Sequence, residues 1–292
     1  MFDFWYFLLR GLQLSAPMAY GALGAVYSET GGVVNIAVEG MMLTGTFFFV
    51  WGATLFKSWI AGLLFAIAGS VLISLIHGLA TITFKVDHVV SGTALNILAS
   101  GLTRFLSMQI FGMETQSTVN PYTPPTFLRI NVIAYFFIPL AIFTVWLLNR
   151  TRFGLRLRSC GQNPWAADSL GVNVYAYKYI GVILSGVFAG LAAATLYPHQ
   201  WIDAMTAGRG FLALAAMIFG NYNPLYAVLA AMLFGYAETL TYFQNQIPLL
   251  SGISPILIKA FPYVLALIVL AGFIGRTKPP KADGVIFEKG EG

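Results

Sequence analysis

Long stretches without a charged side chain are the feature that most constrains this chain. Four such runs contain no Asp, Glu, Lys or Arg, and they cover residues 60–84, 130–149, 179–198 and 210–237. A helix needs about 20 apolar residues to cross about 30 Å of hydrocarbon, and each run reaches that length. Two further runs, 30–56 and 256–275, carry one charged residue each, Glu39 and Lys259. The sequence therefore predicts several membrane-spanning helices.

The composition agrees with a chain surrounded by lipid. Charged residues make up only 9% of the sequence, whereas soluble domains carry about 25%. Only helices and closed β-barrels satisfy all their backbone polar groups inside a bilayer, and the strand-like alternation of a barrel is absent here. We therefore predict an all-α polytopic integral membrane protein.

About nine membrane-spanning helices are expected, with eight or ten as alternatives. They lie near residues 5–27, 33–56, 60–84, 89–112, 131–149, 179–199, 207–221, 224–244 and 256–275. The segment near 207–221 is short for a full crossing, so a broken or re-entrant helix remains open there. Residues 1–275 are expected to form the transmembrane domain and residues 276–292 a tail that is disordered or loosely docked.

Basic residues set the expected orientation, because loops rich in Lys and Arg stay in the cytoplasm. They bracket the loop 150–178 and recur in the tail 276–292, beginning at Arg276. Both segments are therefore predicted to be cytoplasmic, and nine crossings then place the N-terminus outside.

Asn35 and Glu39 are the most unusual polar residues inside the apolar runs. They lie four apart in "NIAVEG", so on a helix they share one face. Ionisable groups in a bilayer face a protein interior or a water-filled path. Glu39 therefore either lines a substrate pathway or caps a broken helix. The glycines around it, Gly31, Gly32, Gly40 and Gly45, fit an interrupted helix or close helix packing.

Further candidates for the lining of a pathway follow on the next spans. Thr93 and Asn96 belong to a polar stripe on the predicted span 89–112, although such side chains also bond to their own helix. The aromatic residues Phe47 and Phe48 lie near Glu39 along the chain. The predicted pathway residues are Asn35, Glu39, Phe47, Phe48, Thr93 and Asn96.

The loop 150–178 contains a short predicted helix. Asn163 followed by Pro164 is a typical helix start, and Gly171 is suited to end the helix after about two turns. Flanked by basic residues, this helix either docks into a groove on a soluble partner or lies along the lipid headgroups.

Three segments of the chain resemble a known family. They read "GLRLRSCGQNPWAADSLGVNV", "SETGGVVNIAVEGMMLTGTF" and "GRGFLALAAMIFGNYNPLYAVLAAMLFG". The chain resembles, from about residue 12 to 275, the permease subunits of ABC importers for nucleosides, simple sugars and branched-chain amino acids. The first segment is similar to the family's cytoplasmic coupling segment, with Gly161, Asn163, Pro164, Ala166, Ala167 and Gly171 in matching places. A bulky charge at Ala167 is accordingly expected to uncouple ATP hydrolysis from uptake.

The resemblance implies a subunit that forms half of a translocation pathway in a bacterial inner membrane. It implies three partners: a second, longer permease subunit, an ABC ATPase with two fused nucleotide-binding domains, and an external substrate-binding lipoprotein. ATP and Mg²⁺ would bind to that ATPase, so no cofactor is expected in this chain. The "NIAVEG" form is similar to nucleoside-type members, with riboflavin or a simple sugar as the alternative solute.

Other classes of protein fit the residues less well. An autonomous ion-coupled secondary transporter is the second hypothesis, but only Glu39 and Glu238 are candidate intramembrane carboxylates. No GxSxG or HExxH motif occurs, and the three histidines are scattered, so we expect neither enzyme activity nor a metal site. No nucleic-acid partner is expected.

Overall fold

The computed structural model describes residues 3–196, 199–247, 252–273 and 277–290, and most of them are helical. The α-helices are α1 (Phe4–Thr30), α2 (Val38–Phe56), α3 (Trp59–Gly78), α4 (His88–Phe111), α5 (Phe137–Arg150), α6 (Arg152–Gln162), α7 (Pro164–Ser169), α8 (Val174–Thr195), α9 (Arg209–Phe219), α10 (Pro224–Phe243) and α11 (Pro255–Phe273). Two short strands, β1 (Thr126–Phe127) and β2 (Ile130–Asn131), pair in an antiparallel hairpin. Arg276 and the last residues of the predicted span 256–275 lie outside the described residues.

Six helical stretches in the described part of the chain are long and apolar enough to cross a membrane. They are Val38–Phe56, Trp59–Thr83, His88–Phe111, Val132–Arg150, Val174–Thr195 and Pro224–Phe243. Each coincides with one of the nine predicted spans. The other three predicted spans correspond to α1, to the 11-residue helix α9 and to α11.

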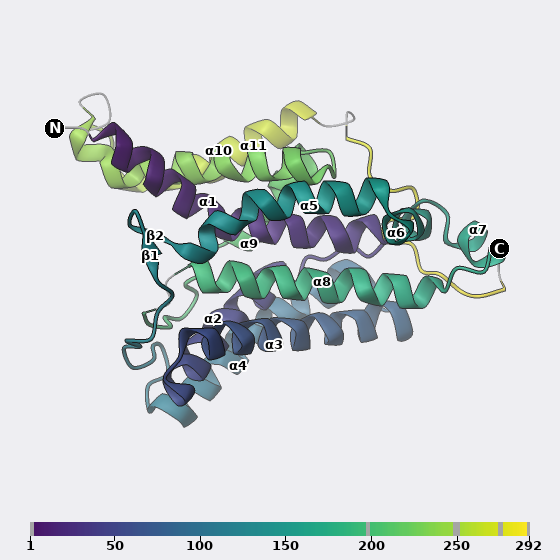
Figure 1. The fold of residues 1–292 in the computed structure, drawn as a ribbon, viewed down its shortest axis with the longest axis horizontal. Helices are drawn as coiled ribbons and strands as arrows, with labels where there is room; N and C mark the ends of the chain where they lie inside the picture. Colours follow the sequence, from purple (N-terminus) through teal and green to yellow (C-terminus); the bar gives the residue numbers. More distant parts are fainter. Residues whose placement is uncertain (1–2, 197–198, 248–251, 274–276, 291–292) are drawn as a thin grey trace.

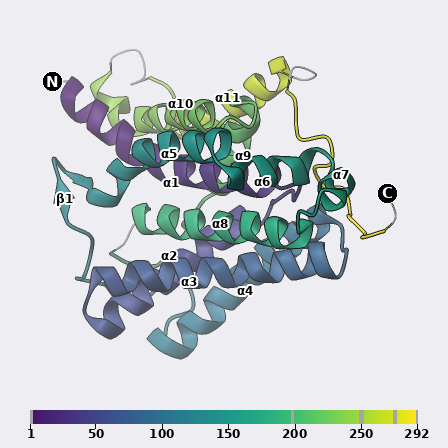
Figure 2. The same ribbon diagram turned by 45° about the vertical axis from the view of Figure 1, so that its right-hand side comes forward.

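Helix α1 forms the centre of the bundle. Every residue from Leu14 to Thr30 is buried, and α8, α9 and α10 pack around it. Figures 1 and 2 show α1 between a layer made of α10 and α11 and a layer made of α2, α3 and α4. Because protein rather than lipid surrounds most of α1, this helix can be less apolar than the outer spans.

Helix α8 packs closely against both α1 and α3. A Cβ atom added at Gly190 would lie only 2.5 Å from Cα of Ile67 on α3, and one at Gly186 would lie 2.9 Å from Cα of Val71. Small residues at four-residue spacing let two helix backbones approach in this way.

The molecule has two distinct ends along its long axis. The start of α1 and the strands β1 and β2 lie at one end, here called the hairpin end. Helices α6 and α7 and the C-terminal segment 277–290 lie at the other, here called the α7 end (Figure 1). Helix α6 occupies part of the predicted loop 150–178, and Thr151 caps it by accepting a hydrogen bond from Gly154 N–H.

Candidate functional site

A non-helical break separates α1 from α2. Residues 31–37 leave the helical conformation, and Gly32 has a φ of +81°, which favours glycine. Such a break exposes backbone N–H and C=O groups that need partners when they are buried in a membrane protein. The predicted span 33–56 therefore starts as a helix only at Val38.

Side chains from α3, α4 and α8 satisfy the backbone of this break. Asn96 on α4 donates through Nδ2 to Ile36 O at 3.0 Å and accepts from Gly40 N–H at 2.7 Å. His77 on α3 donates through Nε2 to Val34 O at 3.0 Å, as the tautomer with a proton on that nitrogen. Asn96 thus ties α4 to the start of α2, as His77 ties α3 to the break.

Further side chains from α4 and α8 also bind the break. Val34 N–H donates to Nδ1 of His88 at 3.1 Å, and Lys178 on α8 donates to Gly32 O at 3.4 Å. Asn35 is completely buried and donates to Ser185 Oγ on α8 at 2.9 Å. Asn35 is therefore a link between the break and α8.

Glu39 binds the start of α9. Its two carboxylate oxygens accept hydrogen bonds from the N–H groups of Gly208, at 2.8 Å, and Gly210, at 2.6 Å. A carboxylate at a helix N-terminus satisfies free amides and complements the positive end of the helix dipole. The sequence left two roles open for Glu39, in a substrate pathway or as a helix cap. Its contacts in the structure are those of a cap.

The start of α9 also carries an ion pair that sequence reasoning missed. Arg209 pairs with Glu238 on α10, and both side chains are largely buried. The sequence feature that could have pointed to this ion pair is Arg209 itself, which lies between Gly208 and Gly210 at the edge of an uncharged run. Glu238 was recognised as a carboxylate, but its partner lies 29 residues away.

The other predicted pathway residues occupy different environments. Phe47 is completely buried among aromatic rings of the chain itself, with the Trp201 ring centroid 5.6 Å away. Phe48 is partly buried next to Trp51. Thr93 lies on the exposed face of α4, and its hydroxyl donates to carbonyl groups of its own helix.

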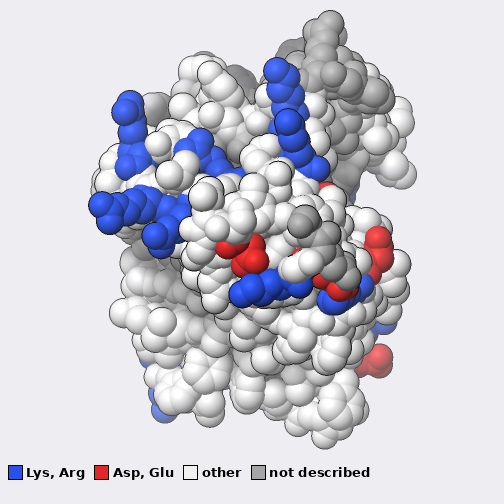
Figure 3. Space-filling view, turned by 90° about the vertical axis from the view of Figure 1, so that its right-hand side faces the viewer, with Lys and Arg blue, Asp and Glu red and all other residues white. Residues whose placement is uncertain are grey.

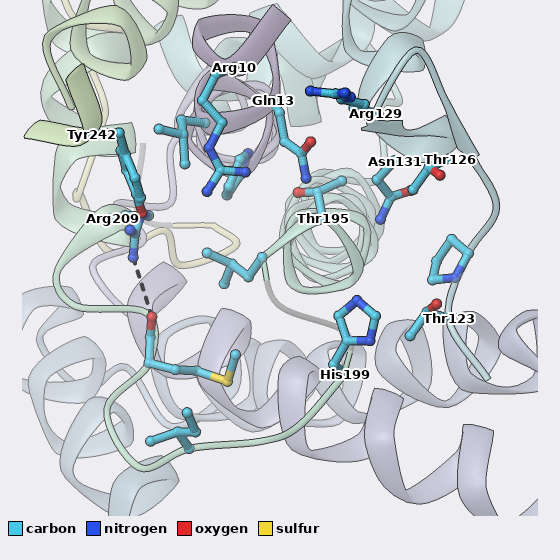
Figure 4. A pocket seen from close by; sticks show the side chains of 16 residues that line it. Arg10, Gln13, Thr123, Thr126, Arg129, Asn131, Thr195, His199, Arg209 and Tyr242 are labelled. Carbon is cyan, nitrogen blue, oxygen red and sulfur yellow. Dashed lines mark hydrogen bonds between the residues drawn. The ribbon is translucent and has the colours of Figure 1, made fainter. Parts of the chain in front are cut away.

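A pocket opens at the hairpin end, and sequence reasoning did not find it. Its volume is about 380 Å³. Figure 4 shows side chains from α1, the hairpin, the end of α8 and α10 around it. Its polar lining includes Arg10, Gln13, Thr123, Thr126, Arg129, Asn131, Thr195, His199, Arg209 and Tyr242. We refer to it as the hairpin-end pocket.

The arginines of this pocket are held by neighbours. The Arg10 guanidinium lies 4.7 Å from the ring centroid of Tyr242, and that of Arg129 lies 5.5 Å from the ring centroid of Tyr6. Arg209 and Tyr242 also line a second cavity of about 480 Å³. The pocket thus offers hydrogen-bond donors and an aromatic ring to a solute.

The loop 150–178 contains the predicted short helix. Asn163 caps α7 by accepting from Ala166 N–H at 3.0 Å, Pro164 occupies the first turn, and Gly171 follows the helix with a φ of +80°. Gly161 lies against the backbone of Thr30 at the end of α1. These residues fix α7 beneath the bundle.

The two faces of α7 have different surroundings. Ala166 is exposed and Leu170, just after the helix, is 84% exposed, whereas Ala167 is 2% exposed and packs inside the chain. A bulky charge at Ala167 would therefore disturb the packing of this chain itself. The exposed side chains at this position are those of Ala166 and Ser169 on α7 and of Leu170 just after it.

The α7 end is rich in basic side chains. Figure 3 views this end and shows Lys and Arg side chains spread over it, with fewer Asp and Glu side chains among them. Among the described residues, α5 and α6 contribute four arginines to this region, namely Arg150, Arg152, Arg156 and Arg158. In Arg156 the guanidinium donates to Tyr177 Oη at 3.3 Å.

Residues 7–270 match a family described as "Branched-chain amino acid transport system / permease component". The chain belongs to this family. It is 41% identical to the nucleoside ABC transporter permease protein NupC of Lactococcus lactis, over 95% of both chains. It is 39% identical to the guanosine ABC transporter permease protein NupQ of Bacillus subtilis, over 96% of this chain and 95% of that one.

A solved structure shares the fold. It is an inward-facing conformation of an ABC transporter assigned to the metal-chelate type, with a TM-score of 0.54 and 17% sequence identity, over 91% of this chain and 85% of that one. The resemblance to ABC importer permeases and the prediction of a multi-pass protein of the bacterial inner membrane are therefore confirmed.

Proposed function

We propose that this chain is the membrane subunit of an ATP-driven importer and forms one half of a translocation pathway for nucleosides. The observation that carries this proposal is the similarity, over nearly the whole length, to NupC and NupQ. The exposed residues of α7 support it, because a permease without its own ATPase needs a surface through which an ATPase acts.

The α7 end is proposed to face the cytoplasm. The Lys and Arg side chains at this end support that orientation. The start of α1 then lies outside, and α1, α2, α3, α4, α5, α8, α9, α10 and α11 provide nine crossings. Helix α9 is the short one, and the cap provided by Glu39 at its start suits a helix that begins inside the protein.

The solute is proposed to enter through the hairpin-end pocket. A volume of about 380 Å³ lies in the range typical of small-molecule sites. The Arg10 guanidinium, which lies over the ring of Tyr242, and the Gln13 amide offer donors to the carbonyl and ring nitrogen atoms of a purine base. Asn35, Glu39 and Asn96 then shape the walls of the pathway, while Thr93 faces the second permease subunit.

The proposed partners follow from the two ends. A longer permease subunit completes the pathway, and a substrate-binding lipoprotein delivers the nucleoside at the hairpin end. An ABC ATPase with two fused nucleotide-binding domains contacts Ala166 and Leu170 at the α7 end. ATP and Mg²⁺ bind to that ATPase, whose closure moves α7 and, through it, the helices.

Co-purification tests this arrangement. The chain, tagged and extracted from its native membrane in mild detergent, is expected to bring down an ATPase and a second permease. Leu170→Asp places a charge on the exposed contact and should remove the ATPase, whereas Val119→Asp, at a 70% exposed position of the hairpin end, should not. Recovery of the chain without any ATPase in the unmodified complex would contradict the proposal.

A further inference from the structure

The C-terminal segment 277–290 packs across the α7 end, although its sequence pattern predicts a disordered or loosely docked tail. Ala282 N–H donates to Gly161 O at 2.8 Å, which joins the segment to the end of α6. Lys278 N–H donates to Asn221 Oδ1 at 2.7 Å, in the turn between α9 and α10. Glu288 forms an ion pair with Lys85, which precedes α4. The segment therefore contacts several separate elements of the bundle.

Phe287 anchors the segment against the coupling helix. Its side chain is only 4% exposed and packs in a cluster with Cys160, Ala167 and Val174. Its ring centroid lies 5.9 Å from that of Trp165 on α7 and 5.3 Å from that of Tyr175 on α8. The buried face of α7 is thus covered by the C-terminal segment.

The residues just before Phe287 contact the break between α1 and α2. The Lys178 ammonium group donates both to Gly32 O in the break, at 3.4 Å, and to Val285 O in the segment, at 3.2 Å. Gly284, with a φ of +74°, lies beside Val34 of the break. One continuous segment therefore touches α7 at one position and the break a few residues earlier.

A partly buried carboxyl group completes this contact. Burial raises the pKa of Asp283 to about 7, against the opposing effects of Glu29 on α1 and of Lys178 on α8. Tyr222, between α9 and α10, also faces the pair formed by Glu29 and Asp283. The segment carries Asp283 into an enclosed site at the end of α1.

We propose that residues 277–290 form a strap that transmits the movement of α7 to the break between α1 and α2, with Phe287 as the positioning residue that seats it. Helix α7 has only six residues, and its buried face rests on Phe287. The break in turn holds α3, α4 and α8 through His77, Asn96 and Lys178. The strap therefore adds a second connection from α7 to the break, beside the direct contact between Gly161 and Gly32. This inference rests on the proposed function of α7 as the ATPase contact.

Whether the strap is docked can be measured by labelling Cys160, without a transport assay. Cys160 is the only cysteine of the chain, it is buried under the strap, and burial raises the pKa of its thiol to about 11. Because the thiolate is the reactive form, a docked strap slows the reaction of Cys160 with N-ethylmaleimide. We expect Phe287→Ala to speed this reaction about tenfold or more, because it opens the buried cluster.

The matched control is the neighbouring residue Ile286, which is 40% exposed. Ile286→Ala should leave the labelling rate of Cys160 unchanged, and Phe287→Leu should restore most of the protection. Labelling is read by mass spectrometry on the peptide that contains Cys160, in the purified complex. Equal labelling of Phe287→Ala and the unmodified chain would overturn the proposed seating.

The coupling role is tested in the same complex, reconstituted with ATP and the substrate-binding protein. Phe287→Ala is expected to lower the nucleoside imported per ATP hydrolysed severalfold, while the complex stays assembled and still hydrolyses ATP. Faster labelling of Cys160 with an unchanged ratio of import to hydrolysis would overturn the strap's role. Absence of ATP-driven import in the unmodified complex would instead refute the proposed function, so the two failures are distinguishable.

Discussion

Replacing Glu39 with glutamine removes the charge that holds the start of α9. The carboxylate accepts two backbone N–H groups, from Gly208 and Gly210, at 2.8 and 2.6 Å. Glutamine keeps one acceptor oxygen but turns an NH₂ group toward the second N–H, so one amide loses its partner.

The expected cost follows from these contacts. A hydrogen bond to a charged group contributes about 1.5–3 kcal/mol, and a buried donor without a partner costs about 1–3 kcal/mol. The lost interaction with the helix dipole adds about 0.3–1 kcal/mol. We therefore expect Glu39→Gln to destabilise the folded chain by about 2–4 kcal/mol, within the range of these terms.

The assay is thermal unfolding of the purified complex in detergent, followed through the tryptophan fluorescence. Glu114→Gln is the matched control, because Glu114 is an exposed carboxylate at the hairpin end. We expect a clearly lower unfolding midpoint for Glu39→Gln and an unchanged midpoint for the control. Equal midpoints together with a loss of nucleoside uptake would refute the capping role and assign Glu39 to the solute path instead.

Two further predictions concern the break and the strap. Asn96→Ala leaves Ile36 O in the break and Gly40 N–H in the first turn of α2 without this partner, so the folded chain should lose about 2–4 kcal/mol of stability. Thr93→Ala should change stability by less than about 0.5 kcal/mol. Similar unfolding midpoints for the two variants would contradict the role of Asn96. The pKa of Asp283 is about 7 when the strap is docked and 3.8 for a free aspartate. Docking is therefore strongest at low pH, weakens as the pH rises toward 7, and is constant above it. Protection of Cys160 should therefore fall between about pH 4 and about pH 7 relative to Asp283→Asn, which stays neutral. Parallel pH profiles of the two proteins would contradict this linkage.

The helices were predictable because the bilayer leaves the backbone few choices. A segment in lipid must satisfy its polar groups internally, so a long uncharged run such as 60–84 specifies a helix on its own. Asn163 and Pro164 predicted the start of α7 for a similar reason, since helix caps depend on neighbouring residues. The glycines around Glu39 left a broken helix open only as one of two interpretations, because close helix packing favours the same residue type.

The partners of the polar residues were not predictable, because they are distant in the sequence. Glu39 binds backbone amides about 170 residues away, and the sequence around Gly208 does not indicate that a carboxylate caps the helix there. The tail 277–290 has no periodicity, so its docking depends on Phe287 meeting a cluster that only the folded chain creates. Phe47 lies in an apolar run whether it faces a pathway or the protein interior, and only the fold, which brings Phe111 and Trp201 next to it, shows that it is enclosed.

Uptake of radiolabelled guanosine into proteoliposomes tests the central claim most directly. The complex purified through this chain is reconstituted, and the substrate-binding protein is added at the hairpin side. We predict uptake that requires both the binding protein and ATP on the α7 side, and that does not respond to a proton or sodium gradient. Guanosine uptake by this chain alone, driven by such a gradient without ATP, would contradict the account.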